Sequence, residues 1–330
     1  MYQLSGQAME RSQMSPKVSI CVVTYNQERY IRDCLVSVLQ QRFDAHIEIL
    51  VGDDASTDGS GKVIASLAAQ YPDVIKHFRH ESNLGGCRNY QFLIERSSGD
   101  YIAHLDGDDF WLPGKLEMQL NFLAKHPECV AVYTNAAVLS SDKALLGAFS
   151  GVQPEIQDLN YLLLRGNYLA HSSLMYRAGL KGSLLSITER FLDYRIHCRL
   201  AMQGKLGFVN STLVAYRAGV QGSVQLTESD AMRKLFWEAL ADVNRLEIKP
   251  TGLVDGVGNF LTRIVSAGIR TSRPRYVYSW IKTVHHETNY RATQILLSFS
   301  KAALRKAGRF VQNALLRVIK KDILLISFNR

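Results

Sequence analysis

Three carboxylates stand within four residues in the stretch YIAHLDGDDFW, residues 101–111. The apolar run over 101–105 is typical of a buried strand, and Gly107 allows a sharp turn between Asp106 and Asp108. In open α/β sheets, ligands gather at the carboxyl ends of the strands. Like charges this close repel one another, and a divalent cation such as Mg²⁺ or Mn²⁺ would relieve the repulsion through the oxygen ligands that it prefers. A solvated acidic turn would show the same residues, so the interpretation depends on what surrounds the turn.

Strand-like and helix-like segments alternate on the way to this turn. Apolar runs rich in β-branched residues predict parallel strands, and apolar residues that recur every three or four positions predict helices packed on one face. The predicted strands span 18–24, 47–51, 74–79 and 101–105, and the predicted helices span 30–39, 63–71 and 87–96. This order predicts an α/β fold with a mixed, mostly parallel sheet flanked by helices.

A second pair of acids follows the second predicted strand. Asp53 and Asp54 come shortly after the run IEILV, so they should reach the same edge of the sheet as the acids at 106–109. The alternative interpretation is a turn that caps the helix beyond Ser56. Neither G-x-G-x-x-G nor G-x-x-x-x-G-K-[ST] occurs, so the usual dinucleotide and P-loop sites are not indicated.

Further elements are expected beyond the acidic turn. The pattern predicts strands over 130–133, 172–176 and 206–216 and helices over 116–123 and 187–201. Asp193 falls near the start of the last of these helices. The stretch 145–160 has no clear period and predicts an irregular loop over the site.

Charge is distributed unevenly along the 330 residues. Residues 1–230 carry 21 Lys+Arg against 24 Asp+Glu, a net charge of −3, whereas residues 231–330 carry 18 against 6, a net charge of +12. We predict a disordered polar tail over 1–15, a globular domain over 16–230 and a basic, mainly helical region over 231–330. The five cysteines form no C-x-x-C, and neither a signal peptide nor a membrane span is recognised, which together favour a cytoplasmic location.

Four segments in order resemble the family 2 glycosyltransferases, which have the GT-A fold. They are VSICVVTYNQERYIRDCLVSVLQQ, ILVGDDASTDGS, NLGGCRNYQFLIERSSGDYIAHLDGDDFWLPGKLEMQ and FLDYRIHCRLA. One D-x-D is a weak signal, but this succession at these spacings is specific. The resemblance implies that residues 16–230 form a GT-A catalytic domain. It also implies transfer of a sugar from a nucleotide diphosphate sugar, with inversion at the anomeric carbon.

The resemblance also assigns residues to the nucleotide. Thr24, Tyr25 and Asn26 would form part of the nucleotide pocket. Asp54 matches the family's base-reading aspartate, and a carboxylate that accepts the N3–H of uracil favours a UDP-sugar donor. Arg88 matches a basic position that supports the phosphates, although an arginine on a helix surface is an equally good interpretation.

Asp106 and Asp108 match the family's D-x-D, which implies bound Mn²⁺ or Mg²⁺ that neutralises charge on the departing nucleotide. Asp108 is the better candidate for direct ligation, while Asp106 acts directly or through the ribose or a water. Arg217 lies in YRAGVQGS, which resembles the family's segment after the base helix, and the resemblance implies that this arginine closes over the diphosphate.

Asp193 matches the catalytic base of the family, although Leu192 stands where the family has Glu. Inversion requires a base on the acceptor side that removes the proton of the attacking hydroxyl. His171 and His197 are the alternative bases, and an ordinary acid at a helix N-terminus is the alternative role for Asp193.

The end of the chain predicts an amphipathic helix. Residues 304, 307, 311, 315 and 318 are apolar and fall on one helical face, basic residues flank them, and an apolar end follows over 323–328. Such a helix, over 301–328, is typical of contact with an anionic membrane surface, here the inner face of the cell membrane. The alternative is docking on the catalytic domain or on a second subunit in a homo-oligomer. The chain carries no recognised nucleic-acid module.

The sequence therefore predicts a metal-assisted, inverting glycosyltransferase of the hexosyltransferase type. Its acceptor would be a glycan or a lipid-linked glycan in bacterial surface polysaccharide synthesis. One rival is a Mg²⁺-dependent phosphatase or nucleotidyltransferase, but a phosphatase would need a nucleophilic Asp where the first strand ends in Thr24, Tyr25 and Asn26. The other rival is a non-catalytic sugar-nucleotide-binding protein.

Overall fold

A computed structural model describes residues 15–219, 230–246, 250–288 and 290–308. Contacts divide the chain into two compact units, the first formed by residues 1–158 and 167–227 and the second by 159–166 and 228–330. The predicted tail over 1–15 lies outside the described residues except for Ser15.

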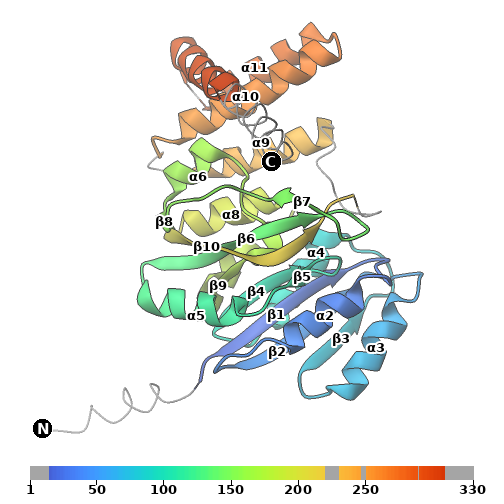
Figure 1. Ribbon diagram of the computed structural model, residues 1–330. Helices are drawn as coiled ribbons and strands as arrows, with labels where there is room; N and C mark the ends of the chain where they lie inside the picture. Colours follow the sequence, from blue (N-terminus) through green and yellow to red (C-terminus); the bar gives the residue numbers. More distant parts are fainter. Residues whose placement is uncertain (1–14, 220–229, 247–249, 289, 309–330) are drawn as a thin grey trace, which may run out of the picture. The chain divides into compact units, whose positions relative to one another are not determined.

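A mixed sheet forms the centre of the first unit (Figure 1). The described residues contribute ten strands to it, in the order β3-β2-β1-β4-β9-β6-β10-β5, with β7 beside β6 and β8 beside β10. The strands are β1 (Lys17–Thr24), β2 (His46–Asp53), β3 (Ile75–Arg79), β4 (Tyr101–Asp106), β5 (Phe110–Trp111), β6 (Cys129–Leu139), β7 (Leu145–Ala148), β8 (Ile156–Gln157), β9 (Met175–Arg177) and β10 (Lys205–Arg217). Strands β3, β2, β1 and β4 are parallel, and β9 runs antiparallel to β4 and β6. The predicted α/β fold is confirmed.

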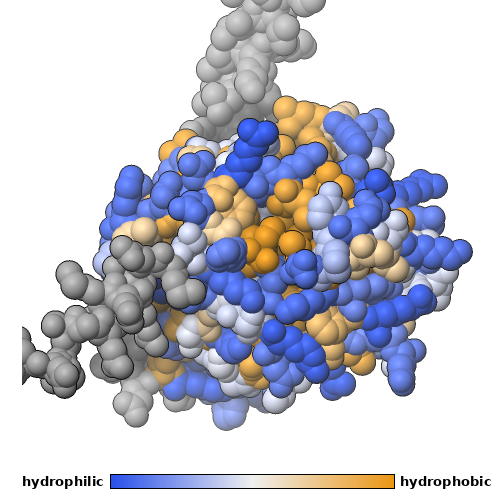
Figure 2. All heavy atoms as spheres, turned by 90° about the horizontal axis from the view of Figure 1, so that it is seen from below, coloured by the Kyte–Doolittle hydropathy of each residue, from blue (hydrophilic) through white to orange (hydrophobic). Residues whose placement is uncertain are grey.

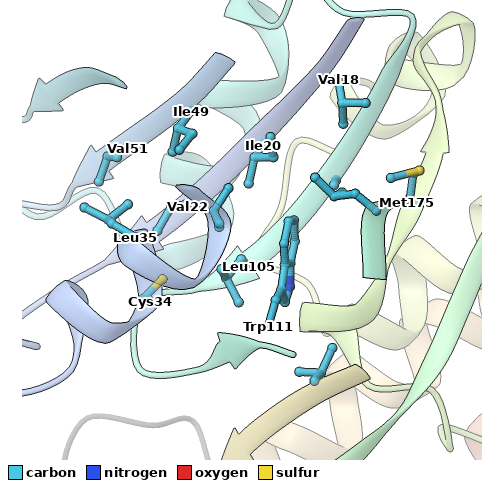
Figure 3. Packing of buried hydrophobic residues seen from close by; sticks show 14 of the residues in the cluster. Val18, Ile20, Val22, Cys34, Leu35, Ile49, Val51, Leu105, Trp111 and Met175 are labelled. Carbon is cyan, nitrogen blue, oxygen red and sulfur yellow. The ribbon is translucent and has the colours of Figure 1, made fainter. Parts of the chain in front are cut away.

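Helices cover both faces of this sheet. In the first unit they are α2 (Ile31–Leu39), α3 (Ser60–Gln70), α4 (Gly86–Arg96), α5 (Lys115–Lys125), α7 (Lys181–Leu185) and α8 (Asp193–Ala201), with short 3-10 turns η1 (His171–Ser173) and η2 (Ala178–Leu180). Val18, Ile20 and Val22 alternate along β1 and therefore share one face, where they join a core with α2, α3 and α5 (Figure 3). Gly52 points to the other face, where a Cβ would lie 2.0 Å from Asn89 Oδ1 of α4. Only glycine lets α4 approach β2 this closely.

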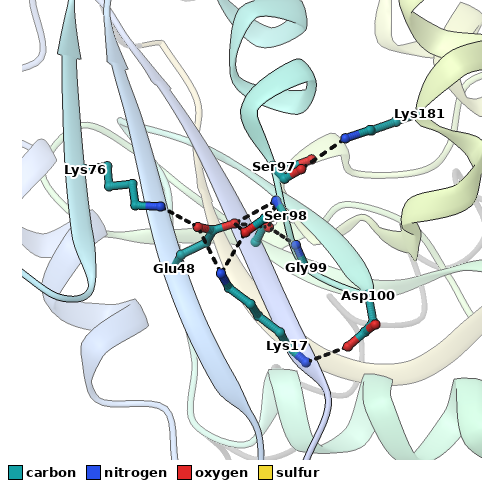
Figure 4. A network of polar contacts seen from close by, with 9 residues as sticks. Lys17, Glu48, Lys76, Ser97, Ser98, Gly99, Asp100 and Lys181 are labelled. Carbon is teal, nitrogen blue, oxygen red and sulfur yellow. Dashed lines mark hydrogen bonds and ion pairs between the residues drawn. The ribbon is translucent and has the colours of Figure 1, made fainter. Parts of the chain in front are cut away.

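A buried ionic network fixes the strands at the end remote from their carboxyl termini (Figure 4). The Glu48 carboxylate of β2 accepts hydrogen bonds from Ser19 Oγ at 2.6 Å, Ser98 N at 2.8 Å and Lys76 Nζ at 2.8 Å. Burial by itself would raise the pKa of Glu48, but these hydrogen bonds outweigh it and hold the pKa well below its ordinary value. The network joins β1, β2, β3 and the turn before β4, so it sets the positions of the strands that carry the acids.

Three local predictions need correction. The helix expected over 187–201 begins only at Asp193. The strand expected over 172–176 starts within η1 and is extended only from Met175. The stretch 145–160, expected to be irregular, contains β7, β8 and the start of α6, because pairing with β6 and β10 supplies order that no local pattern encodes.

The second unit is helical, as predicted. It contains α6 (Leu159–Arg165), α9 (Asp230–Asn244), α10 (Leu253–Arg270), α11 (Pro274–Thr288) and helical residues 292–308. Aromatic rings form its centre, with Phe260 5.2 Å from Trp237 and 5.1 Å from Trp280 between centroids. None of the helices in the described ranges has the length and apolar character required to cross a membrane.

The predicted membrane helix over 301–328 is only partly described. Residues 301–308 are helical, and Leu304 on the predicted apolar face is 73% exposed. Residues 309–328 lie outside the described ranges. Figure 2 shows one face of the molecule, which is largely hydrophilic with apolar side chains gathered near its middle, as is common on globular surfaces.

Candidate active site

The acidic turn follows β4 directly and is shaped by its contact with the end of β1. Gly107 N donates to Val23 O at 2.9 Å, and Asp109 N donates to Asp106 O at 2.9 Å. A Cβ at Gly107 would lie 2.5 Å from Gln27 Oε1 and 2.8 Å from Thr24 Cβ. The glycine between the two acids is therefore required for close approach, which places the turn against residues 24–27.

Asp106 is partly exposed to solvent, with 42% of its side chain accessible. Its Oδ1 lies 3.0 Å from His104 Nε2, and its Oδ2 lies 3.1 Å from Ser172 Oγ. Burial would raise the pKa of Asp106, but attraction to His104 and hydrogen bonds with His104 and Ser172 outweigh it and lower the pKa. Asp106 is therefore held in its charged form.

Asp108 and Asp109 are more deeply placed, at 6% and 0% exposure. Burial and the charge of Asp106 raise the pKa of Asp108 to about 7. Burial and the charges of both other acids raise the pKa of Asp109 well above its ordinary value. Ser172 Oγ lies 2.6 Å from Asp109 Oδ2, and Arg217 N donates to Asp109 Oδ1 at 2.9 Å. Burial and mutual repulsion therefore oppose the ionisation of all three carboxyls at once.

Arg217 lies beneath this turn and is fully buried. Its Nη1 donates to the Asp108 carbonyl, and its Nη2 donates to Asp33 Oδ2 at 3.0 Å. The guanidinium also lies 4.9 Å from the ring of Tyr30 and 4.8 Å from the ring of Phe110. In this structure Arg217 supports the turn from below, and the predicted closure over a diphosphate would require it to leave these contacts.

The residues predicted to bind the nucleotide lie at the same edge. Asp54 N donates to Thr24 O at 3.0 Å, and the Asp54 carboxylate accepts hydrogen bonds from Leu84 N at 2.7 Å and Gly85 N at 2.9 Å. Asp54 thus ties the end of β1 to the loop before α4.

Three more predicted nucleotide residues differ in exposure and in contacts. Tyr25 is 43% exposed, whereas Asn26 has a φ of 52° and its Oδ1 accepts from Thr57 N at 2.7 Å. Arg88 is exposed in the first turn of α4, beyond the loop that Asp54 holds. A ligand could therefore reach Tyr25 and Arg88 directly, while Asn26 is committed to the turn after β2.

Asp193 reaches this edge from a distant part of the sequence. It is the first residue of α8 and is exposed, and the preceding segment is joined to α4 because Cys87 Sγ donates to Phe191 O at 3.2 Å. The surrounding protein and the charge of Asp106 raise the pKa of Asp193 to about 6, against an opposing effect of His104. Asp193 can therefore take up a proton near neutral pH.

Behind the turn, His104, which the sequence analysis did not single out, forms a row with the two alternative bases His171 and His197. The rings of His104 and His171 lie 4.0 Å apart between centroids, and His171 Nδ1 lies 3.3 Å from His197 Nε2. Burial lowers the pKa of both His171 and His197, the latter to about 3. At 9% and 0% exposure they lie in the interior, and their lowered pKa values make them less suited than Asp193 to act as the base. His104 could have been found, since it stands two residues before Asp106 on the same strand face. Ser172 carried no local signal.

The chemistry of the turn suits a divalent cation. The described part of the chain contains no group of three or more His, Cys, Asp or Glu side chains arranged for a metal. Mg²⁺ and similar ions, however, are commonly held by one or two carboxylates together with waters and substrate phosphates. Asp106 and Asp108 meet that requirement, and a cation would offset the repulsion that raises the pKa of Asp108.

Comparisons with solved structures agree with this fold. TarS from S. aureus, solved with UDP-GlcNAc, matches with a TM-score of 0.59 and 16% identity over 76% of this chain and 73% of TarS. The mannosyltransferase PcManGT from Pyrobaculum calidifontis, solved with GDP-Man and Mn²⁺, matches with a TM-score of 0.52 and 16% identity over 89% of both chains. At these identities the likeness concerns the fold, which is the GT-A arrangement predicted from the sequence.

Sequence comparisons extend the likeness to a family. A protein of Mycobacterium tuberculosis without an assigned activity is 30% identical over 67% of this chain, and the chain spans 64% of that relative's length. EpsE of Bacillus subtilis, a protein with a provisional glycosyltransferase assignment, is 32% identical over 58% of this chain and 69% of its own length. Residues 19–164 match the family described as glycosyl transferase family 2. The strands, the acidic turn and these relatives lead to one conclusion, which is that the chain belongs to glycosyl transferase family 2.

Proposed function

We propose that this protein is an inverting glycosyltransferase of the hexosyltransferase type. It would move a hexose from a UDP-sugar to a glycan or lipid-linked acceptor. The observation that supports the proposal is that Asp54 and the acidic turn of Asp106 and Asp108 both adjoin Thr24, where β1, β2 and β4 end, and that Asp193 lies within reach of the charge of Asp106. Asp54 and the acidic turn are joined through Thr24, and Asp106 raises the pKa of Asp193 by its charge. TarS and PcManGT hold nucleotide-sugars on the same fold, which supports a donor of this class.

The donor half of the proposed site has three parts. The exposed ring of Tyr25 and the carboxylate of Asp54 would receive the base, with Asp54 accepting the N3–H of uracil. Arg88, exposed beyond the loop, would add positive charge near the phosphates. Asp108 and Asp106 would hold Mn²⁺ or Mg²⁺, which would supply positive charge for the diphosphate. Arg217 and Ser172 would keep the turn in place through the contacts described above.

The acceptor half depends on Asp193. Its carboxylate would remove the proton from the acceptor hydroxyl while the hydroxyl oxygen forms a bond to the anomeric carbon. The bond from that carbon to the diphosphate breaks on the opposite side, so the configuration inverts. A pKa of about 6 suits this role, because the carboxylate is mostly ionised at neutral pH and still basic enough to accept the proton.

The proposed setting is bacterial surface polysaccharide synthesis at the cytoplasmic face of the membrane. Its support comes from one relative, TuaG of Bacillus subtilis, which has a provisional assignment as a teichuronic acid biosynthesis glycosyltransferase and is 34% identical over 41% of this chain. Contact with the membrane through residues 301–328 remains part of the proposal, as does the alternative of a homo-oligomer.

Two measurements test the proposal. Calorimetry with UDP and with GDP in the presence of Mn²⁺ should show tighter binding of UDP, and Asp108→Asn should weaken it. A panel of nucleotide-sugars should then reveal slow donor hydrolysis for one donor class. If the protein binds no nucleoside diphosphate with Mn²⁺, the proposed function is wrong; if it binds but never hydrolyses or transfers any donor, it is a sugar-nucleotide-binding protein instead.

A further inference from the structure

A second candidate binding site, lined by several arginines, lies in the helical second unit, far from the acidic turn in sequence. A pocket of about 410 Å³ is lined by Asp230 and Arg233 of α9, by Arg270 at the end of α10, and by Arg273 and Tyr276 at the start of α11. Its volume falls within the roughly 300–1,000 Å³ typical of ligand sites. The guanidinium groups of three arginines therefore line a single pocket.

The single carboxylate in the lining is shared between two of these arginines. Asp230 Oδ1 accepts from Arg233 Nη1 at 2.7 Å, whereas Asp230 Oδ2 lies 4.0 Å from Arg273 Nη1. Arg233 is only 12% exposed and also reaches Tyr276 OH at 3.4 Å, so it is committed to the wall of the pocket. Arg273 is 65% exposed and loosely paired. The lining thus holds three positive charges and one negative charge, a net charge of +2.

Other carboxylates of the second unit serve other partners. Asp242 pairs with Arg245 at 2.7 Å, and Asp255 pairs with Arg305 at 3.2 Å. Glu287 accepts from Trp237 Nε1 at 2.6 Å.

The backbone around the pocket is well defined by local hydrogen bonds. Arg273 N donates to Gly268 O at 2.9 Å, and Thr271 Oγ1 donates to Ala267 O at 2.9 Å. These bonds close the turn between α10 and α11, which carries Arg270 and Arg273. The end of a helix attracts basic residues through its dipole, but that dipole amounts to about half a charge and does not account for three arginines at one hollow.

We propose that this pocket binds a phosphate group, either a phosphomonoester or a diphosphate. Three arginines in one lining favour an anion, and the planar fork of arginine donors suits phosphate oxygens. The pocket is open to solvent at Arg270 and Arg273, so the phosphate can come from a free molecule or from a phosphorylated lipid headgroup. This site uses no residue of the acidic turn and does not depend on the proposed glycosyl transfer.

The test uses the full chain and pyrophosphate as the probe. Calorimetry is performed in EDTA, so that the acidic turn cannot hold pyrophosphate through a cation. The variant is Arg270→Gln with Arg273→Gln, two exposed positions whose change should leave the helices folded. Arg275→Gln is the matched control, since Arg275 is an exposed arginine of the same turn of α11 that does not line the pocket. Thermal unfolding of each variant verifies the fold.

We expect pyrophosphate to bind the wild type and the control equally and to bind the double variant roughly tenfold or more weakly, as expected when charge-assisted hydrogen bonds are lost. Flotation with phosphatidylcholine vesicles, with and without phosphatidic acid, identifies the source. Loss of phosphatidic acid binding in the double variant alone, without measurable pyrophosphate binding, supports a lipid headgroup. The proposal is overturned if neither probe binds, if the double variant binds like the wild type, or if Arg275→Gln weakens binding as much as the double variant.

Discussion

Replacement of Asp193 by Asn is the sharpest test of the proposed chemistry. The change keeps the size of the side chain and removes its ability to accept a proton. Asp193 is exposed at the first position of α8, and the side-chain oxygen of Asn can accept the hydrogen bond that the carboxylate receives from its own backbone N–H. The fold should therefore be retained, while loss of a general base should lower the turnover roughly 10²–10⁴-fold.

The pH dependence of the transfer rate provides a second quantitative test of Asp193. A base works in its ionised form, so a pKa raised to about 6 makes the rate rise with pH through that value. Ionisation with this pKa falls from about 90% at pH 7 to about 10% at pH 5, which predicts a roughly ninefold lower rate at pH 5. Because a bound cation offsets the charge of Asp106, the midpoint in the metal-loaded enzyme should lie at or below about 6.

The assay is transfer of labelled sugar from the donor identified by the nucleotide-sugar panel, with calorimetry of UDP and Mn²⁺ in parallel. Asp193→Asn should lose transfer and keep UDP and Mn²⁺ binding. Asp73→Asn is the matched control, because Asp73 is an exposed aspartate in the turn before β3, at the opposite end of the strands, and its loss should leave the rate unchanged. Full activity in Asp193→Asn, or a midpoint of the pH profile clearly above 6, would refute the assignment.

Three further predictions concern the framework of the site. Ser172→Ala removes a hydroxyl within 3.1 Å of Asp106 Oδ2 and 2.6 Å of Asp109 Oδ2, so it should lower the free energy of unfolding by roughly 2–3 kcal/mol and weaken Mn²⁺ binding; unchanged Mn²⁺ affinity would contradict the positioning role. Gly107→Ala should weaken UDP binding at least severalfold in the same calorimetry, because its Cβ would displace Gln27 from 2.5 Å, and an unchanged affinity would show that the turn can adjust. Glu48→Gln should lower the free energy of unfolding by about 2 kcal/mol at pH 7. Since the folded pKa of Glu48 is depressed, its stabilisation is present above its ordinary pKa of 4.5 and is lost as the pH falls further, so urea unfolding should show the two proteins converging at low pH.

The sequence by itself determined the elements whose patterns are local. The apolar run at 18–24 became β1, and the helical spacing over 30–39 became α2. The acids at 53–54 and 106–109 follow β2 and β4, and the parallel order of those strands brings them to one edge. These features could be predicted because side-chain periodicity and strand order are readable from neighbouring residues.

Only the tertiary structure decided what holds the acids in place. Ser172 meets Asp109 across 63 positions of the chain, and Arg217 meets the same carboxylate across 108 positions. Contacts at such separations depend on how β9 and β10 pair within the sheet, which leaves no periodic trace around either residue. The charge states follow from the same cause, because burial and neighbouring carboxylates shift the pKa values of Asp108 and Asp193. The arginine pocket likewise exists only because the ends of α9, α10 and α11 meet in the folded second unit.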